Sequence, residues 1–146
     1  MLAPLPVPAK PALLILAMLL AAMSLGGCST PAVGAPCLPE QIPETGFDPR
    51  EAYIESSSVQ CETRVCMVYQ LAGDPTCPPT QSTEDHKCAE VSDVEQSVYC
   101  TCRCDSGSTG FAECECPDGF TCVEVLNKGG PGVRGGYCVK NSTVTR

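Results

Sequence analysis

Hydrophobic and polar positions alternate most regularly in the middle of the chain. From Val65 to Leu71 every second residue is apolar, a period of two that is typical of a β-strand. The pattern predicts one strand within residues 51–60 and a second within residues 64–71. Cys61 and Cys66 bracket the turn between them.

Weaker patterns follow toward the C-terminus. Residues 90–98 begin with the spacing of a short helix, and the chain reads as extended from Tyr99 onward. Residues 121–126 predict a strand, residues 128–136 a glycine-rich loop, and residues 137–140 the returning strand. We therefore expect a small disulfide-rich fold of loops and short antiparallel β-hairpins, with little helix outside the leader.

The longest apolar run lies near the N-terminus. Residues 12–23 are apolar without a break, and Lys10 is the one charged side chain before them. A helix of this length falls short of the roughly 20 residues that span a bilayer. A positive start, a short apolar run and small residues after it are typical of a secretory signal peptide. Residues 1–27 are therefore predicted to be a leader.

The end of this leader has a distinctive sequence. Leu25-Gly26-Gly27-Cys28 resembles the bacterial lipobox. The resemblance implies cleavage before Cys28, with diacylglycerol on its sulfur and an acyl chain on its new amino group, and two or more chains anchor a protein stably. Ser29, which follows the cysteine, resembles the residue found at that position in lipoproteins that are sorted to the outer membrane. The expected location is the bacterial envelope, in the outer membrane; the alternative is an ordinary signal peptide or N-terminal anchor without a role for Cys28.

The remaining chain divides by composition. Residues 28–36 are predicted to form the lipidated cysteine and a flexible tether, because they are small, uncharged and contain proline. Residues 37–140 form the cysteine-rich domain, which the pattern divides further into 37–92 and 93–140. Residues 141–146 follow the last cysteine and are expected to fray.

Cysteine usage indicates the source of stability. Thirteen cysteines in 146 residues, 13/146 or about 9%, lie in the range of exported disulfide scaffolds. With Cys28 assigned to lipid the count is even, and an oxidising compartment preserves disulfides. Six disulfides are therefore expected among the remaining twelve cysteines, which are Cys37, Cys61, Cys66, Cys77, Cys88, Cys100, Cys102, Cys104, Cys114, Cys116, Cys122 and Cys138.

Alternating cysteines surround the polar segment 105–113. In a strand, alternate residues share a face, so neighbouring cysteines of each run should bond across to another segment. A hairpin through residues 105–113 would pair Cys104 with Cys114 and Cys102 with Cys116.

The same repeats resemble metallothioneins. Five thiolates could then bind Zn²⁺ or Cu(I). Oxidation in the exported compartment favours disulfides instead, so we expect neither a bound metal nor a cofactor. The five cysteines of this alternative are Cys100, Cys102, Cys104, Cys114 and Cys116.

Charge and motifs limit the function. Seventeen acidic and nine basic residues give a net charge of −8, and loss of Lys10 with the leader gives 8 − 17 = −9. So few basic residues argue against nucleic-acid binding. His86 is the only histidine and lies in the polar loop at residues 80–87. The chain contains no G-x-S-x-G, H-E-x-x-H or C-x-x-C motif, so we expect no enzymatic activity.

Two family resemblances complete the sequence picture. The string Cys114-x-Cys116-Pro-Asp-Gly-Phe-x-Cys122 resembles the end of an EGF-like module. The strings SSSVQCETRVCMVYQL, YCTCRC, CPDGFTCVEVL and GGYCVK resemble cysteine-rich lipoproteins of myxobacterial type. The expected function is a lipid-anchored, non-enzymatic envelope protein whose stapled domain is a binding or structural module for a protein or glycan. The alternative is a thiolate metal-binding (Zn/Cu) or thiol redox lipoprotein.

Overall fold

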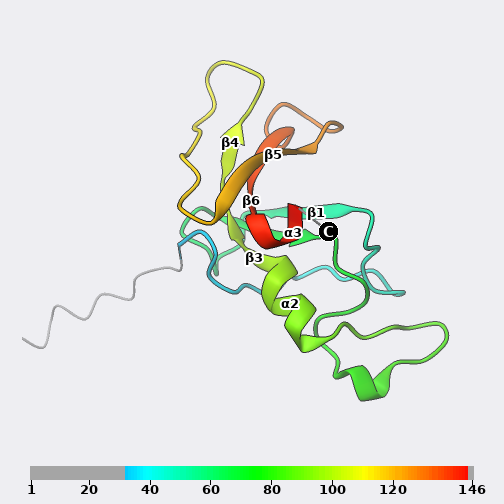
Figure 1. Cartoon of the computed structure of the whole chain (residues 1–146). Helices are drawn as coiled ribbons and strands as arrows, with labels where there is room; N and C mark the ends of the chain where they lie inside the picture. The colour runs from blue at the N-terminus through cyan, green and yellow to red at the C-terminus, as the bar shows by residue number, and fades with distance from the viewer. Residues whose placement is uncertain (1–31, 145–146) are drawn as a thin grey trace, which may run out of the picture.

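The computed structural model describes residues 32–144 (Figure 1). Short strands form two three-stranded antiparallel sheets, and short helices and loops connect them, which confirms the predicted fold class. The leader, Cys28 and residues 145–146 lie outside the described residues. The elements in chain order are β1 (Ala52–Ser56), β2 (Val65–Tyr69), η2 (Pro79–Gln81), α2 (Val91–Ser97), β3 (Val98–Thr101), β4 (Arg103–Asp105), β5 (Phe120–Leu126), β6 (Gly135–Lys140) and α3 (Asn141–Val144).

The first sheet has the strand order β1-β2-β3. Met67 at its centre lies opposite Ile54 of β1 and Tyr99 of β3. Because side chains alternate along a strand, Cys66 and Val68 face the opposite side of the sheet from Met67. All three are buried, so both faces of the first sheet are covered.

One face of this sheet packs against loops and helix α2. Phe47, Leu71 and Ala89 are buried there with Val98, and Val94 of α2 packs against them. The ring of Phe47 meets that of Tyr53 edge to face, with 4.7 Å between centroids. This first core connects the loops that precede β1 and follow β2.

The other face packs against the second sheet, whose strand order is β4-β6-β5. The second core contains Met67, Tyr99, Tyr137 and Val139, and apolar side chains of β5 pack around it. Figure 1 shows β4, β5 and β6 on one side of the first sheet and α2 on the other. The change of sheet falls at Cys102, because β3 pairs with β2 and the next residues form β4. This lies beyond the division predicted between residues 92 and 93.

Six disulfides divide in the same way as the sheets. Three connect residues within 37–100 and three connect residues within 102–138, and none of the six joins the two halves. The two halves are connected by the peptide chain, by the second core and by hydrogen bonds such as those from the Thr101 hydroxyl to the Cys138 carbonyl and from the Lys140 N–H to the Tyr99 hydroxyl. The pairs are Cys37–Cys66, Cys61–Cys100, Cys77–Cys88, Cys102–Cys114, Cys104–Cys122 and Cys116–Cys138.

The predicted pairing of Cys104 with Cys114 and Cys102 with Cys116 is wrong. It assumed that the two cysteine runs form adjacent strands, but β4 pairs with β6, and the next strand begins only at Phe120. The Cys114 N–H donates to the carbonyl of Arg103, at 2.9 Å, which brings Cys114 beside Cys102.

Both ends of the described chain are more ordered than predicted. Residues 34–36 were expected to belong to a tether, but the Gly34 N–H donates to the Cys100 carbonyl and the Cys100 N–H donates to Ala35, both at 2.8 Å. These bonds cover the outer edge of β3. Residues 141–144 were expected to fray, but they form α3, because Thr143 is buried and its hydroxyl donates to the carbonyl of Lys140.

Candidate functional site

The structure describes every cysteine that the sequence analysis assigned to a disulfide, and Cys28 lies outside the described residues. All twelve from Cys37 to Cys138 are in disulfides, including the five considered as metal ligands. Within residues 32–144, no helix combines the length and the apolar character needed to cross a membrane. The features that remain are a groove beside β1 and a polar cluster around His86.

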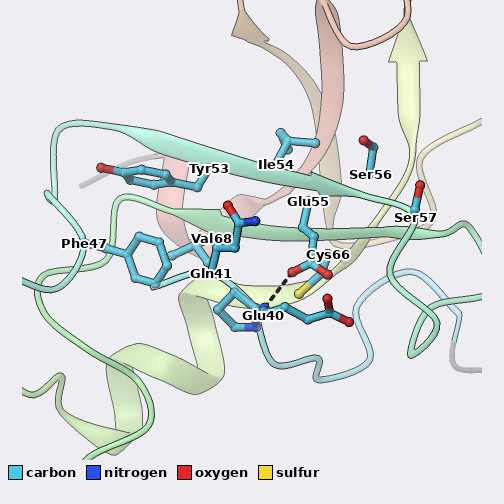
Figure 2. A pocket seen from close by; sticks show the side chains of 11 residues that line it. Glu40, Gln41, Phe47, Tyr53, Ile54, Glu55, Ser56, Ser57, Cys66 and Val68 are labelled. Atoms are coloured by element: carbon cyan, nitrogen blue, oxygen red, sulfur yellow. Dashed lines mark hydrogen bonds between the residues drawn. The ribbon is translucent and has the colours of Figure 1, made fainter. Parts of the chain in front are cut away.

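The groove follows the outer edge of β1 and has a volume of about 360 Å³. Phe47, Cys66 and Val68 form its buried floor. Glu40 from the preceding loop and Glu55 from β1 lie at its rim, as Figure 2 shows. The sequence did not indicate this groove, because the loop at residues 39–41 is brought to β1 by contacts distant in the chain.

Two cross-links hold that loop against the sheet. The Cys37–Cys66 disulfide joins the chain just before the loop to strand β2. The side-chain amide of Gln60 donates to the Leu38 carbonyl at 2.7 Å, and its oxygen accepts the Leu38 N–H at 2.9 Å. The wall and the floor of the groove are therefore fixed relative to each other.

Strand β1 offers its free backbone edge to this groove. Hydrogen bonds from Ser57 N–H to Arg64 and from Gln70 N–H to Glu51 set the register of the β1–β2 pair. Since bonded and non-bonded positions alternate in an antiparallel ladder, the N–H and C=O groups of Ala52, Ile54 and Ser56 face away from β2. In the part of the chain that the structure describes, no strand pairs with that side.

The groove is acidic. Its lining includes Glu40 and Glu55 and contains no basic side chain. One oxygen of Glu55 accepts the Glu40 N–H at 2.8 Å, so this carboxylate is held at the rim (Figure 2). At the other end the Tyr53 hydroxyl donates to Glu51 at 2.9 Å. Burial, and then the nearby Glu51, raises the pKa of Tyr53, so the phenol stays neutral.

His86, which the sequence places in a polar loop, belongs to a polar cluster in the fold. Its Nε2 atom lies 3.1 Å from Oδ2 of Asp74 and 3.6 Å from Sγ of Cys77. Its Nδ1 atom lies 2.7 Å from the carbonyl oxygen of Glu44. The cluster thus places the only histidine beside the Cys77–Cys88 disulfide. The short spacing between His86 and Cys88 is the part of this cluster that the sequence could have indicated. Asp74 is distant in the sequence and reaches the cluster only in the folded chain.

Asp74 is positioned by its neighbours. Burial raises its pKa, but hydrogen bonds to Oδ1 from Thr76 N–H (2.7 Å) and from the Thr76 hydroxyl (2.6 Å) outweigh this effect. The electrostatic interaction and hydrogen bond with His86 lower the pKa of Asp74 further, so the net shift is downward and the carboxylate is ionised. Oδ2 is left facing Nε2 of His86.

Comparison with known proteins adds no relative to this description. No protein-family model, no curated protein and no solved structure matches the chain. The functional argument therefore depends on the groove and the His86 cluster themselves.

Proposed function

We propose that this chain is a lipid-anchored, non-enzymatic envelope protein, and that its disulfide-stapled domain is a binding module for an extended, basic peptide segment of another envelope protein. The observation that carries the proposal is the acidic groove beside the free edge of β1. The lipobox-like sequence at Cys28 supports the anchor. Residues 29–33 then connect the lipid to the first backbone contact of the domain, at Gly34.

The free edge of β1 supports binding of an extended segment. A peptide strand placed beside β1 would receive backbone hydrogen bonds from Ala52, Ile54 and Ser56, as in other strand-addition complexes. Such bonds are independent of peptide sequence and provide affinity. Specificity then comes from the side chains that face the groove.

The rim and floor of the groove support a choice of peptide. Tyr53 and Glu55 lie on the same face of β1, and a paired peptide would place alternate side chains beside them. A lysine or arginine next to Glu55 would neutralise that carboxylate. An apolar side chain two residues away would contact Tyr53 and Phe47. The preferred segment therefore has a basic and an apolar residue two positions apart, on the same face of the peptide strand.

The test uses the full chain, produced with its leader and purified in detergent. The probe is a blocked seven-residue peptide, Lys-Thr-Val-Thr-Lys-Thr-Val, which places Lys and Val alternately on one face, and the control peptide replaces Lys with Glu. Isothermal titration calorimetry at low salt should detect the lysine peptide and not the glutamate peptide. Equal affinity for the two peptides, or no binding of either, would refute the proposal.

Three variants locate the binding surface. Glu55→Gln removes a charge but keeps an oxygen that can accept the Glu40 N–H. We expect about fivefold weaker binding, since a partly exposed ion pair contributes about 1 kcal/mol. Ile54→Pro removes an outward N–H without removing a bond to β2 and should abolish binding. Glu124→Gln, on exposed strand β5, removes the same charge from the other sheet and should have no effect.

The anchor needs a separate experiment. Palmitate labelling of the chain in a Gram-negative host should disappear in Cys28→Ala and persist in Ser29→Ala. Equal labelling of the chain and the Cys28→Ala variant would show that the lipobox-like sequence is not used.

A further inference from the structure

Three possible ligand atoms lie close together at the Cys77–Cys88 disulfide, and a carboxylate lies beside one of them. The Sγ atoms of Cys77 and Cys88 and the Nε2 atom of His86 lie within 4.8 Å of one another. Oδ2 of Asp74 lies 3.1 Å from the same Nε2 atom. Two sulfurs, an imidazole nitrogen and a carboxylate oxygen are a ligand set that zinc accepts in proteins.

The distances agree with a tetrahedral centre. With bonds of about 2.3 Å to sulfur and 2.0–2.1 Å to nitrogen, a tetrahedral zinc site places those two atoms about 3.5 Å apart. His86 Nε2 and Cys77 Sγ are 3.6 Å apart. The corresponding nitrogen–oxygen distance is about 3.4 Å, and the observed distance between His86 and Asp74 is 3.1 Å. On reduction the two bonded sulfurs would have to separate, and Oδ2 of Asp74 would have to approach them, to complete the tetrahedron.

The surroundings orient the ligands as metal sites do. A ligating histidine normally donates its other N–H to a carbonyl or carboxylate, which fixes the ring. Here Nδ1 of His86 is directed to the Glu44 carbonyl, at 2.7 Å. Thr76 occupies Oδ1 of Asp74 through two hydrogen bonds and leaves Oδ2 free for a metal.

Backbone contacts would keep the site together without the disulfide. The Asp74 N–H donates to the Lys87 carbonyl at 2.7 Å, and the Ala89 N–H donates to the Asp74 carbonyl at 2.8 Å. The N–H of Cys88 also donates to the hydroxyl of Ser82, at 2.9 Å. These bonds join the two ends of the loop that contains all four ligands, so reduction would leave the ligands close together.

We propose that Cys77, Cys88, His86 and Asp74 form a zinc site that opens when the Cys77–Cys88 disulfide is reduced. A dithiol supplies two electrons and two protons, the S–S bond breaks to give two thiols, and the dithiol becomes a disulfide. Zn²⁺ then binds both sulfurs as thiolates, with release of two protons, and binds Nε2 and Oδ2. The other disulfides have no histidine ligand, since the chain contains one histidine. The site is separate from the groove and does not require the proposed peptide.

The test begins with reduction of the full chain under nitrogen. The chain is treated with increasing amounts of dithiothreitol, which gel filtration then removes. Alkylation and peptide mapping identify the cysteines that have opened. Cys77 and Cys88 should react while Cys61 and Cys100, which are fully buried, stay bonded. If Cys77 and Cys88 open only when the buried pair opens too, the proposal is wrong.

Cobalt then reports the ligands. One Co²⁺ per reduced chain should give the thiolate charge-transfer and intense visible bands of a tetrahedral site, and Zn²⁺ should displace it. His86→Gln keeps an N–H donor toward Asp74 but removes the ligand nitrogen, and should weaken Co²⁺ binding more than about tenfold. Glu84→Gln changes an exposed carboxylate of the same loop and should bind as the parent chain does.

Two results would overturn the proposal. One is a reduced Cys77–Cys88 pair with no tetrahedral cobalt spectrum, and the other is equal binding by His86→Gln and Glu84→Gln. Neither result bears on the groove, because peptide binding is measured on the fully oxidised chain. A chain that binds cobalt but not the lysine peptide would refute the proposed function alone.

Discussion

The strongest test of the fold is a substitution at Met67, in the core between the two sheets. Met67 is fully buried, and it packs with Tyr99, Tyr137 and Val139. No disulfide joins residues 37–100 to residues 102–138, so this core and a few hydrogen bonds hold the halves together. Met67→Ala should therefore loosen the contact between the sheets while all six disulfides remain.

The size of the effect follows from the atoms removed. Met67→Ala deletes Cγ, Sδ and Cε, and burial of groups of this size contributes roughly 0.8 kcal/mol each, or about 2 kcal/mol together. A cavity that does not collapse adds about 1–2 kcal/mol, at ~24 cal/mol per Å³. We expect the free energy of unfolding to fall by about 3 kcal/mol, within the ~2–5 kcal/mol typical of such substitutions.

Urea unfolding under non-reducing conditions measures this loss, and hydrogen exchange locates it. Amides of β5 and β6 should exchange faster in Met67→Ala, whereas those near the Cys61–Cys100 disulfide should change less. The control is Val91→Ala, since Val91 is 64% exposed at the start of α2 and should change stability by less than about 0.5 kcal/mol. A loss below 1 kcal/mol for Met67→Ala would refute the assignment of this core.

Three further changes test individual contacts. Burial raises the pKa of Tyr99 to about 12, whereas the phenol of the unfolded chain ionises near pH 10. The neutral phenol therefore contributes about 3 kcal/mol to the free energy of unfolding, in full below pH 10, and this contribution should be lost as the pH rises toward 12. Tyr99→Phe should flatten that decline in urea unfolding. Gly135→Ala should cost more than about 2 kcal/mol in the same assay, because φ is +129° and a Cβ would collide with the Asp105 carbonyl, whereas Gly132→Ala meets no atom within 4 Å and should be neutral. Ser58→Ala should raise the free energy of unfolding by about 1 kcal/mol, and the melting temperature with it, because the buried Ser58 hydroxyl has no hydrogen-bond partner within residues 32–144.

Local patterns predicted the strands well and their partners poorly. The alternation after Arg64 located β2, and the apolar pattern of residues 121–126 located β5. The strand predicted within residues 51–60 ends at Ser56, because Ser57 has a φ of +96° that a strand does not allow. The pairing of β4 with β6 depends on a segment more than thirty residues away. No local pattern contains that information, so the predicted disulfides near Cys104 were wrong.

The two candidate sites differ in how much the sequence could reveal. The count of cysteines and the absence of enzyme motifs were readable, because they depend on composition and short spacing. The His86 cluster was not, since Asp74 reaches it through a backbone pairing with Lys87 and Ala89. The groove also depends on tertiary contacts: its wall and floor are brought together by the Cys37–Cys66 disulfide and by the amide contact between Gln60 and Leu38.

The position of the disulfides allows the two sites to work independently. The groove depends on Cys37–Cys66, where both residues are buried, and on the amide contact between Gln60 and Leu38. A peptide that binds there would encounter a wall that is already fixed, so little affinity is lost to ordering the protein. The proposed zinc site uses a different disulfide, and its loop ends stay joined at Asp74 when that bond opens. Reduction of Cys77–Cys88 should therefore leave the affinity for the lysine peptide unchanged, and loss of peptide binding on that reduction would show that the two regions unfold together.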